Sequence, residues 1–304
     1  MDCVEEGGDM EITMARYAGF CPGVRRAIRM AEEVLRDPGK PAFSVGPIIH
    51  NPQVVEELER KGLRVLPEDP AEWEEAGLAG SRVIIRSHGI PPLLTRRLMD
   101  LGAEPVDATC PTVKKAQKAA MRLVGEGYHL FIVGNREHPE VEAILGHVNR
   151  DAVVIKEIRE LKEWWEGQTR MVRKVGLIAQ TTVDLLTFRS LVEGLITEVP
   201  EMIREVSEMK LINTLCRNTL ARQAEALQLA LAHDLVVVVG GRNSSNTEFL
   251  RKICETAGAR AVKVETAEEL DLSEFKEVSR VAVVGGASTP RKRLEEVRCL
   301  LAGL

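Results

Sequence analysis

Three cysteines, Cys21, Cys110 and Cys216, stand in matching sequence contexts although they lie far apart in the chain. Each comes where an apolar stretch gives way to a predicted helix, in G-F-C-P-G-V-R-R-A, D-A-T-C-P-T-V-K-K-A and N-T-L-C-R-N-T-L-A-R-Q-A. The first two segments share Cys-Pro, then Val, two basic residues and Ala. If three such units pack around a common axis, their thiols meet at one point. Three thiolates suit an iron–sulfur cluster, because they hold three irons and leave the fourth open to a substrate.

The other three cysteines, Cys3, Cys254 and Cys299, repeat no pattern. We expect them to serve as buried small hydrophobic residues. Six scattered cysteines indicate reduced thiols and not a disulfide framework. A structural zinc site on the three matching cysteines is disfavoured, because such sites usually show close C-x-x-C spacing.

The composition is that of a globular protein, with 304 residues of which 44% are hydrophobic and 29% are charged. A net charge of -5 gives no general attraction to nucleic acid or anionic membranes. No apolar run approaches the ~20 residues of a membrane span, and the acidic first residues are unlike a signal peptide. We therefore expect a cytoplasmic protein with no nucleic-acid and no membrane partner.

Six strong apolar runs follow the cysteines, two after each, and each run ends in a polar loop. Continuous Val, Ile and Leu runs bounded by Gly indicate strands of a parallel sheet that is buried on both faces. Weaker strand candidates lie at 63–66, 152–155 and 261–264. We predict an α/β fold of three similar small parallel-sheet domains in a pseudo-threefold trefoil around a central cluster cavity. The predicted boundaries are a polar tail at 1–12 and domains at 13–109, 110–208 and 209–304.

The loops after these strands carry most of the polar residues that could bind a ligand. Ligands of open parallel sheets bind outside the carboxyl ends of the strands. A helix start can also hold an anion, although Ser245 with Glu248, and Glu140 beside Pro139, equally fit ordinary helix capping. The candidates from these loops are His50, His88, His138, Glu140, Thr181, Thr182, Ser244, Ser245, Asn246 and Ser288.

The chain resembles the 4-hydroxy-3-methylbut-2-enyl diphosphate reductase family, the iron–sulfur reductases that end the methylerythritol phosphate route to isoprenoids. The resemblance covers about residues 13 to 290 and is carried, in order, by G-F-C-P-G-V, I-H-N, S-H-G, D-A-T-C-P, H-P-E-V-E, A-Q-T-T, N-S-S-N-T and G-G-A-S-T-P. The chain departs from the commoner pattern in T-L-C-R-N-T and in N-R-E before His138.

The resemblance implies a role for each candidate. Cys21, Cys110 and Cys216 would hold one 4Fe-4S cluster, whose fourth iron would bind the substrate hydroxyl. Glu140 would deliver protons, and Thr181 would orient the hydroxyl and relay the proton, with Gln180 and Thr182 in support. The residues implied for diphosphate binding are His50, His88, His138, Ser244, Ser245, Asn246 and Ser288.

The implied reaction is a reductive dehydroxylation that gives isopentenyl and dimethylallyl diphosphate, with two single electrons passing through the cluster. No G-x-G-x-x-G follows a strand, so the electrons would come from a partner, for which the resemblance implies a ferredoxin or flavodoxin type protein. Two alternatives remain: a non-redox iron–sulfur dehydratase, and a cluster-bearing sensor or binding module.

Overall fold

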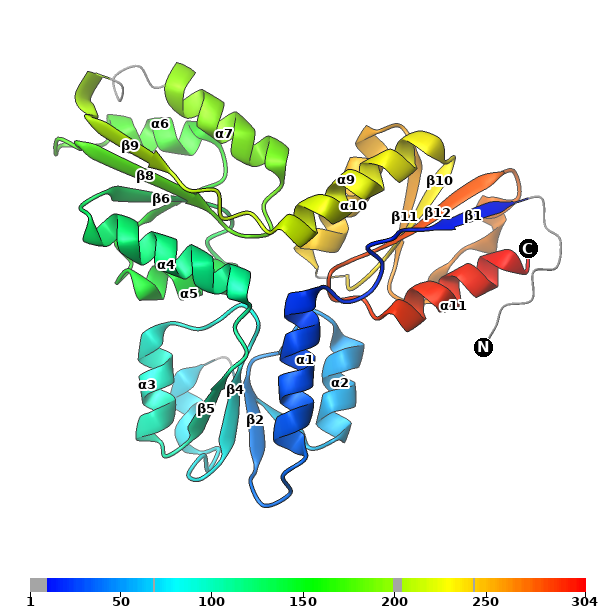
Figure 1. Ribbon diagram of the computed structural model, residues 1–304, viewed down its shortest axis with the longest axis horizontal. Coiled ribbons are helices and arrows are strands. Elements are labelled where there is room, and N and C mark those ends of the chain that lie inside the picture. The colour runs from blue at the N-terminus through cyan, green and yellow to red at the C-terminus, as the bar shows by residue number, and fades with distance from the viewer. Residues whose placement is uncertain (1–9, 68, 199–203, 243) are drawn as a thin grey trace. The chain divides into compact units, whose positions relative to one another are not determined.

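A computed structural model describes residues 10–67, 69–198, 204–242 and 244–304. These residues form three four-stranded sheets in which every strand pairing is parallel. The chain divides into two compact units: unit 1 contains residues 1–25, 49–60 and 217–304, and unit 2 contains residues 26–48 and 61–216. Figure 1 labels most of the helices and strands of both units.

Unit 1 contains one sheet with the strand order β1-β12-β10-β11. Alternate residues of the central strands are buried on opposite faces: Val237 and Val283 pack with the core on one side, and Val238 and Val284 pack with the core on the other. This burial on both faces explains the continuous valine runs in the sequence. The strands are β1 (Glu11–Met14), β10 (Leu235–Val239), β11 (Arg260–Val264) and β12 (Arg280–Gly285).

Helices cover both faces of the unit 1 sheet. Leu294 and Val297 of α11 (Arg291–Ala302) join the core on one face. Ala226 of α9 (Arg217–Ala232) and Leu250 of α10 (Ser245–Thr256) join the core on the other face. The unit also contains α2 (Pro52–Arg60), the short 3-10 helices Ala267–Glu269 and Leu272–Phe275, and the start of α1 (Pro22–Leu35).

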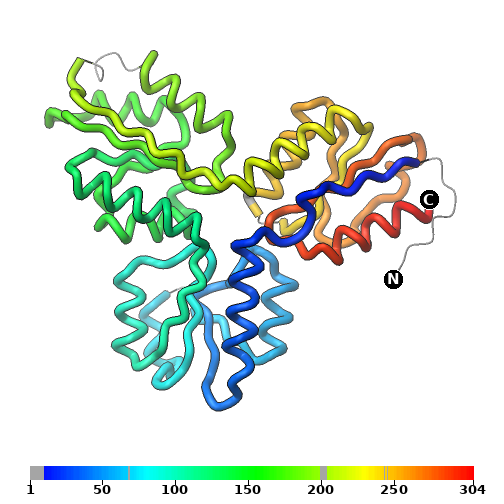
Figure 2. Tube along the Cα trace, viewed as in Figure 1, coloured from blue at the N-terminus to red at the C-terminus, as the bar shows by residue number. Residues whose placement is uncertain are grey.

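The first strand of the chain pairs with the last strand. β1 lies beside β12 with Glu11 opposite Arg280 and Met14 opposite Val283, and Figure 2 shows this blue segment running along the orange one. The predicted boundaries instead assign residues 11 and 12 to a polar tail and residues from 13 onward to the first domain. The structure places Glu11–Met14 in the sheet of β10, β11 and β12. Within the described residues only the helix α11 follows β12, so β1 supplies the fourth strand of that sheet.

Unit 2 contains two sheets, with strand orders β3-β2-β4-β5 and β7-β6-β8-β9. The first is formed by β2 (Ala42–Val45), β3 (Leu63–Leu66), β4 (Arg82–Ile85) and β5 (Glu104–Asp107). The second is formed by β6 (His129–Val133), β7 (Val153–Ile155), β8 (Lys174–Ala179) and β9 (Glu208–Leu211). The helices of unit 2 are the larger part of α1, α3 (Pro92–Asp100), α4 (Pro111–Gly125), α5 (Pro139–His147), α6 (Ile158–Glu166) and α7 (Leu185–Thr197), with a 3-10 helix at Pro70–Glu74.

The two sheets of unit 2 are tied together where α5 meets the loop after β4. A Cβ atom on Gly146 of α5 would lie 2.4 Å from Cβ of Pro91, so only glycine fits there. On its other side α5 packs with α4 against the second sheet, through Val141 and Ile144 of α5 and Ala120 of α4. This packing fixes the start of α5 relative to the loop that carries His88.

All three sheets have the same strand order. Counted along the chain, the order is second, first, third, fourth in each sheet, if β1 is taken as the fourth strand after β10, β11 and β12. The prediction of three similar α/β units with parallel sheets is therefore confirmed. Their arrangement as a trefoil around one cavity stays a prediction. In the described part of the chain, no helix is both long enough and apolar enough to cross a bilayer.

Candidate functional site

Cys21, Cys110 and Cys216 occupy equivalent places in the three sheets. Each follows the fourth strand of a sheet and directly precedes a helix, α1, α4 or α9. The backbone N–H of each cysteine donates a hydrogen bond to the residue two positions after the end of the third strand. The acceptors are the carbonyls of Ala287, Ser87 and Thr181, at 2.9, 2.9 and 2.8 Å. The repeat in the sequence thus corresponds to a repeated backbone geometry.

The local chemistry of these cysteines suits metal ligation. A helix start stabilises a thiolate, and the backbone N–H of Val24 donates to Sγ of Cys21 at 3.4 Å. All three cysteines are partly exposed. Cys254, in contrast, is fully buried, and burial raises the pKa of its thiol to about 11. Three accessible thiols at helix starts therefore fit an iron–sulfur cluster, whereas Cys254 does not.

The remaining cysteines modify one expectation. Cys299 on α11 is disulfide-bonded, which differs from the expectation that all six cysteines are reduced thiols. Cys3 lies outside the described residues.

In unit 2, Glu140 and Thr181 form a buried acid–hydroxyl pair. The backbone N–H of Thr181 donates to Oε1 of Glu140 at 2.6 Å, and the Thr181 hydroxyl donates to Oε2 at 2.8 Å. Glu140 is 1% exposed and Thr181 is 4% exposed. Since the carbonyl of Thr181 also accepts from Cys216 N–H, one residue connects the acid to a cysteine loop.

Burial raises the pKa of Glu140 to about 7, although both hydrogen bonds from Thr181 favour the carboxylate and act in the opposite direction. Its place in the first turn of α5 also favours the charged form. The loss of hydration outweighs these contributions. Glu140 can therefore still carry a proton to donate near neutral pH, whereas an exposed glutamate has already lost its proton.

His138 precedes α5 and caps it. Its Nδ1 accepts a hydrogen bond from the backbone N–H of Glu140 at 3.1 Å. A nitrogen that accepts has no proton, so in this geometry the ring proton of neutral His138 is on Nε2. His138 can thus donate one hydrogen bond, from Nε2, to a ligand.

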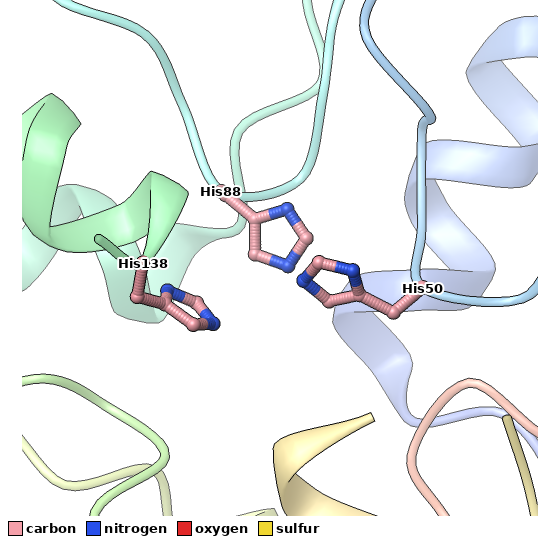
Figure 3. A group of neighbouring side chains, drawn as sticks. All are labelled: His50, His88 and His138. Carbon is pink, nitrogen blue, oxygen red and sulfur yellow. The ribbon is translucent and has the colours of Figure 1, made fainter. Parts of the chain in front are cut away.

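His88, in the loop after β4, lies next to His138. The ring centroids are 5.5 Å apart and the planes are nearly perpendicular, at 84°. Figure 3 shows both rings, which come from different sheets of unit 2. The predicted candidates His88, His138, Glu140 and Thr181 therefore gather at the carboxyl ends of the strands of this unit. His50, also labelled in Figure 3, belongs to unit 1.

Gln180 holds the loop before His138. Its Oε1 accepts from the backbone N–H of Asn135 at 3.0 Å, and its Nε2 donates to the hydroxyl of Thr182 at 2.7 Å. Gln180 thus connects the N-R-E segment to the loop after β8, and the supporting role expected for Gln180 and Thr182 stays a prediction.

In unit 1, the loop that carries His50 interlocks with the loop that carries Ser288. The Ser288 hydroxyl donates to the carbonyl of His50 at 3.0 Å, and Nδ2 of Asn51 donates to the carbonyl of Ser288 at 3.0 Å. Asn51 also caps α2 by accepting from the N–H of Val54 at 3.1 Å. No role was assigned to Asn51 from sequence, although an Asn directly before a helix-first proline is a typical capping signal.

Ser244 and Asn246 present unused hydrogen-bonding capacity at the start of α10. The Ser244 hydroxyl accepts from the N–H of Thr247 at 3.3 Å and so keeps its proton for another acceptor. Both amide atoms of Asn246 are buried and have no hydrogen-bond partner among the residues that the structure describes, and the residue is 8% exposed. An orphaned amide of this kind at a helix N-terminus is suited to an anion. The side chain of Ser245 lies outside what the structure describes.

The family model described as "LytB protein" matches residues 12–302. A 4-hydroxy-3-methylbut-2-enyl diphosphate reductase of Geobacter sulfurreducens is 40% identical over 95% of this chain and 95% of its own length. The enzyme of the same name from Aquifex aeolicus is 39% identical, with the same coverage of both chains.

Two solved structures resemble the fold. One is of (E)-4-hydroxy-3-methyl-but-2-enyl diphosphate reductase, described as the terminal enzyme of the non-mevalonate pathway; it has a TM-score of 0.69 and 36% identity, and covers 97% of this chain and all of that one. The other is the E-1-hydroxy-2-methyl-but-2-enyl-4-diphosphate reductase of Plasmodium falciparum, with a TM-score of 0.86, 25% identity, and coverage of 96% and 88%. Since the family model and the relatives span nearly the whole chain, this protein belongs to the LytB protein family.

Proposed function

We propose that this protein reduces 4-hydroxy-3-methylbut-2-enyl diphosphate to isopentenyl diphosphate and dimethylallyl diphosphate. The substrate loses its allylic hydroxyl as water and takes up two electrons and two protons, one for the leaving oxygen and one for carbon. The observation that carries the proposal is the Glu140–Thr181 pair, because a buried acid with a pKa of about 7, hydrogen-bonded to a hydroxyl, suits proton delivery at neutral pH.

Cys21, Cys110 and Cys216 would hold a 4Fe-4S cluster, as their equivalent places at three helix starts support. When bound, the cluster supplies single electrons and a Lewis-acidic iron that has no cysteine ligand. The protein's part is to keep three thiolates available to the cluster and to place proton donors and anion ligands.

The residues implied for diphosphate binding would each supply a hydrogen-bond donor. In unit 1 the amide of Asn246, the hydroxyl of Ser244 and the ring of His50 serve this role, and in unit 2 His88 and the Nε2 proton of His138 do so. Ser245 belongs to the same set. The Ser288 hydroxyl donates to the carbonyl of His50, so it would help to position the loop that carries His50. To donate to the diphosphate, Ser288 would have to give up this hydrogen bond.

Proton transfer would begin at Glu140. With Glu140 protonated, the carboxyl O–H donates to the Thr181 hydroxyl, which then points its own proton at the substrate oxygen. The short contacts of 2.6 and 2.8 Å to Thr181 hold the acid in one orientation. Gln180 and Thr182 hold the same loop.

The test is turnover by protein purified without oxygen. With a chemical reductant and the diphosphate substrate, we expect both products and one water lost per two electrons consumed. Without reductant we expect no reaction. Loss of hydroxide without reductant would instead show a dehydratase, and substrate binding with no product under either condition would show a sensor or binding module.

Replacing Asn246 by alanine should separate binding from stability. Removing a buried, unsatisfied amide relieves a cost of about 1–3 kcal/mol, so the free energy of unfolding should not fall and is expected to rise. Loss of a charge-assisted bond to the diphosphate should raise KM by roughly 10- to 150-fold with kcat little changed, because this contact exists in both ground and transition states. Denaturant unfolding and steady-state kinetics measure the two effects. A normal KM would exclude Asn246 from the anion site.

A further inference from the structure

The helix that begins after Cys110 is unusual in its charge. α4 contains four cationic residues and no acidic one, whereas each of the other α-helices whose bounds are given above contains at least one Asp or Glu. The net charge of the whole chain is -5, so this helix is a local exception. Its cationic residues are Lys114, Lys115, Lys118 and Arg122.

The outer two cations of α4 are neutralised and the middle two are not. Lys114 pairs with Asp107 at 2.5 Å and Arg122 pairs with Glu126 at 2.9 Å. Lys115 and Lys118 are exposed, and neither forms an ion pair within the described ranges of the chain. Met121, three residues further on, is 41% exposed.

These three residues share the outer face of α4, because positions three apart on a helix are neighbours. The opposite face is buried against the second sheet of unit 2, through Ala116, Ala120 and Leu123. We call Lys115, Lys118 and Met121 the basic face. It is an exposed strip of one helix whose apolar end is Met121.

The basic face lies close to a proposed cluster ligand. A helix rises ~1.5 Å per residue, so Lys115 and Lys118 are roughly 8 and 12 Å along the helix from Cys110. Any protein that covers this face therefore comes near a group held by Cys110. Electron transfer between proteins requires such an approach of the two redox centres.

We propose that the basic face is the docking surface for a small acidic one-electron carrier protein of the iron–sulfur or flavin type. This rests on the proposed function, which consumes two electrons for each substrate molecule. Each docking event would oxidise one carrier by one electron and reduce the enzyme by one, and two events would complete a turnover. Charge complementarity sets the encounter rate and orientation, and the methionine supplies an adaptable apolar contact.

The test uses the holoenzyme with Lys115 and Lys118 both changed to Glu. Turnover is measured with two electron sources: an acidic 2Fe-2S ferredoxin kept reduced by its NADPH-dependent reductase, and dithionite-reduced methyl viologen. We expect the ferredoxin-driven kcat/KM for the carrier to fall by ~10- to 100-fold at low salt, because steering of this size is typical of charged partners. The viologen-driven rate should stay within about twofold of wild type.

The matched control changes Lys252 and Lys276 to Glu. Both are exposed residues of unit 1, and the change in net charge is the same. This control should keep its ferredoxin-driven rate. Added salt should slow the wild-type reaction with ferredoxin and affect the Lys115/Lys118 variant little, since the Debye length falls to ~10 Å at 0.1 M.

A Lys115/Lys118 variant that keeps its ferredoxin-driven rate, or a control that loses as much, would overturn the docking proposal. So would an equal loss with both electron sources, and so would a wild-type enzyme that accepts electrons from viologen and never from the acidic carrier. A wild-type enzyme that makes no product with viologen would overturn the proposed function, and the docking proposal with it.

Discussion

Changing Cys110 to serine is expected to leave a folded protein that retains little iron or sulfide after anaerobic purification. A serine hydroxyl is a poor ligand for a cluster that prefers thiolates. Mutation of a residue that only supports a metal ligand typically lowers metal affinity by roughly 10- to 100-fold. Loss of a ligand itself should weaken cluster binding further, so we expect activity to fall by at least ~10²-fold. Iron and sulfide analysis, with the electron paramagnetic resonance spectrum of the reduced protein, measures the loss. Cys21 and Cys216 should behave alike because their backbone settings are equivalent.

The control for this experiment is Cys254→Ala. Cys254 is fully buried in the core of unit 1, and its thiol pKa is raised to about 11 by burial. Its removal should cost some stability and leave the cluster intact. If the Cys254 variant lost its iron as completely as the Cys110 variant, the assignment of the three ligands would be wrong.

Glu140→Gln should assemble the cluster and bind the substrate but turn over ~10²- to 10⁴-fold more slowly, the usual loss when a general acid is removed. Glutamine keeps the shape of the side chain and can still accept from the N–H of Thr181, but it has no carboxylic proton. Thr181→Val should act in the same direction and less strongly, because water can partly replace a relaying hydroxyl. Single-turnover measurements with prereduced enzyme separate this defect from slow electron delivery. Near-normal turnover of the glutamine variant would show that Glu140 has only a structural role at the start of α5.

The pH dependence gives a second measure of the same residue. The pKa of Glu140 is about 7 in the folded protein, against an ordinary value of 4.5. The acid form is lost above neutral pH, so wild-type kcat should fall as the pH rises through about 7. The raised pKa also means that the folded state binds the extra proton, so its contribution to stability is complete below about pH 4.5 and is lost as the pH rises to 7, by roughly 3 kcal/mol in total. The glutamine variant should lack this slope in denaturant unfolding followed against pH.

The two interior strands and one edge strand of each sheet could be predicted from sequence, whereas the other edge strand could not. The six strong apolar runs are β2, β4, β6, β8, β10 and β12, and the three weaker candidates are β3, β7 and β11. The missed strands are β1, β5 and β9, each the fourth strand of its sheet and each partly exposed. A strand at the edge of a sheet packs on fewer neighbours and so needs no continuous apolar run. These strands lead to the three cysteines, so the segments nearest the chemistry were the hardest to recognise.

Some features of the candidate site could likewise be predicted from sequence, and others are seen only in the structure. Residue types and motif order were enough to select Glu140 with Thr181, and the structure adds that both are buried and that burial decides the pKa. The tautomer of His138 and the engagement of the Ser288 hydroxyl with His50 depend on single hydrogen bonds to the backbone. No sequence pattern specifies such bonds, because they depend on where the chain returns after many residues.

The pairing of β1 with β12 sets an order for biogenesis. β1 is synthesised long before β12, with which it pairs, and before Ala287, whose carbonyl accepts from Cys21. Unit 2 contains all of its own strands and can fold while synthesis continues. Cys21 therefore reaches its final place only after β12 and Ala287 have been made, so a cluster held by all three cysteines would be inserted after that point.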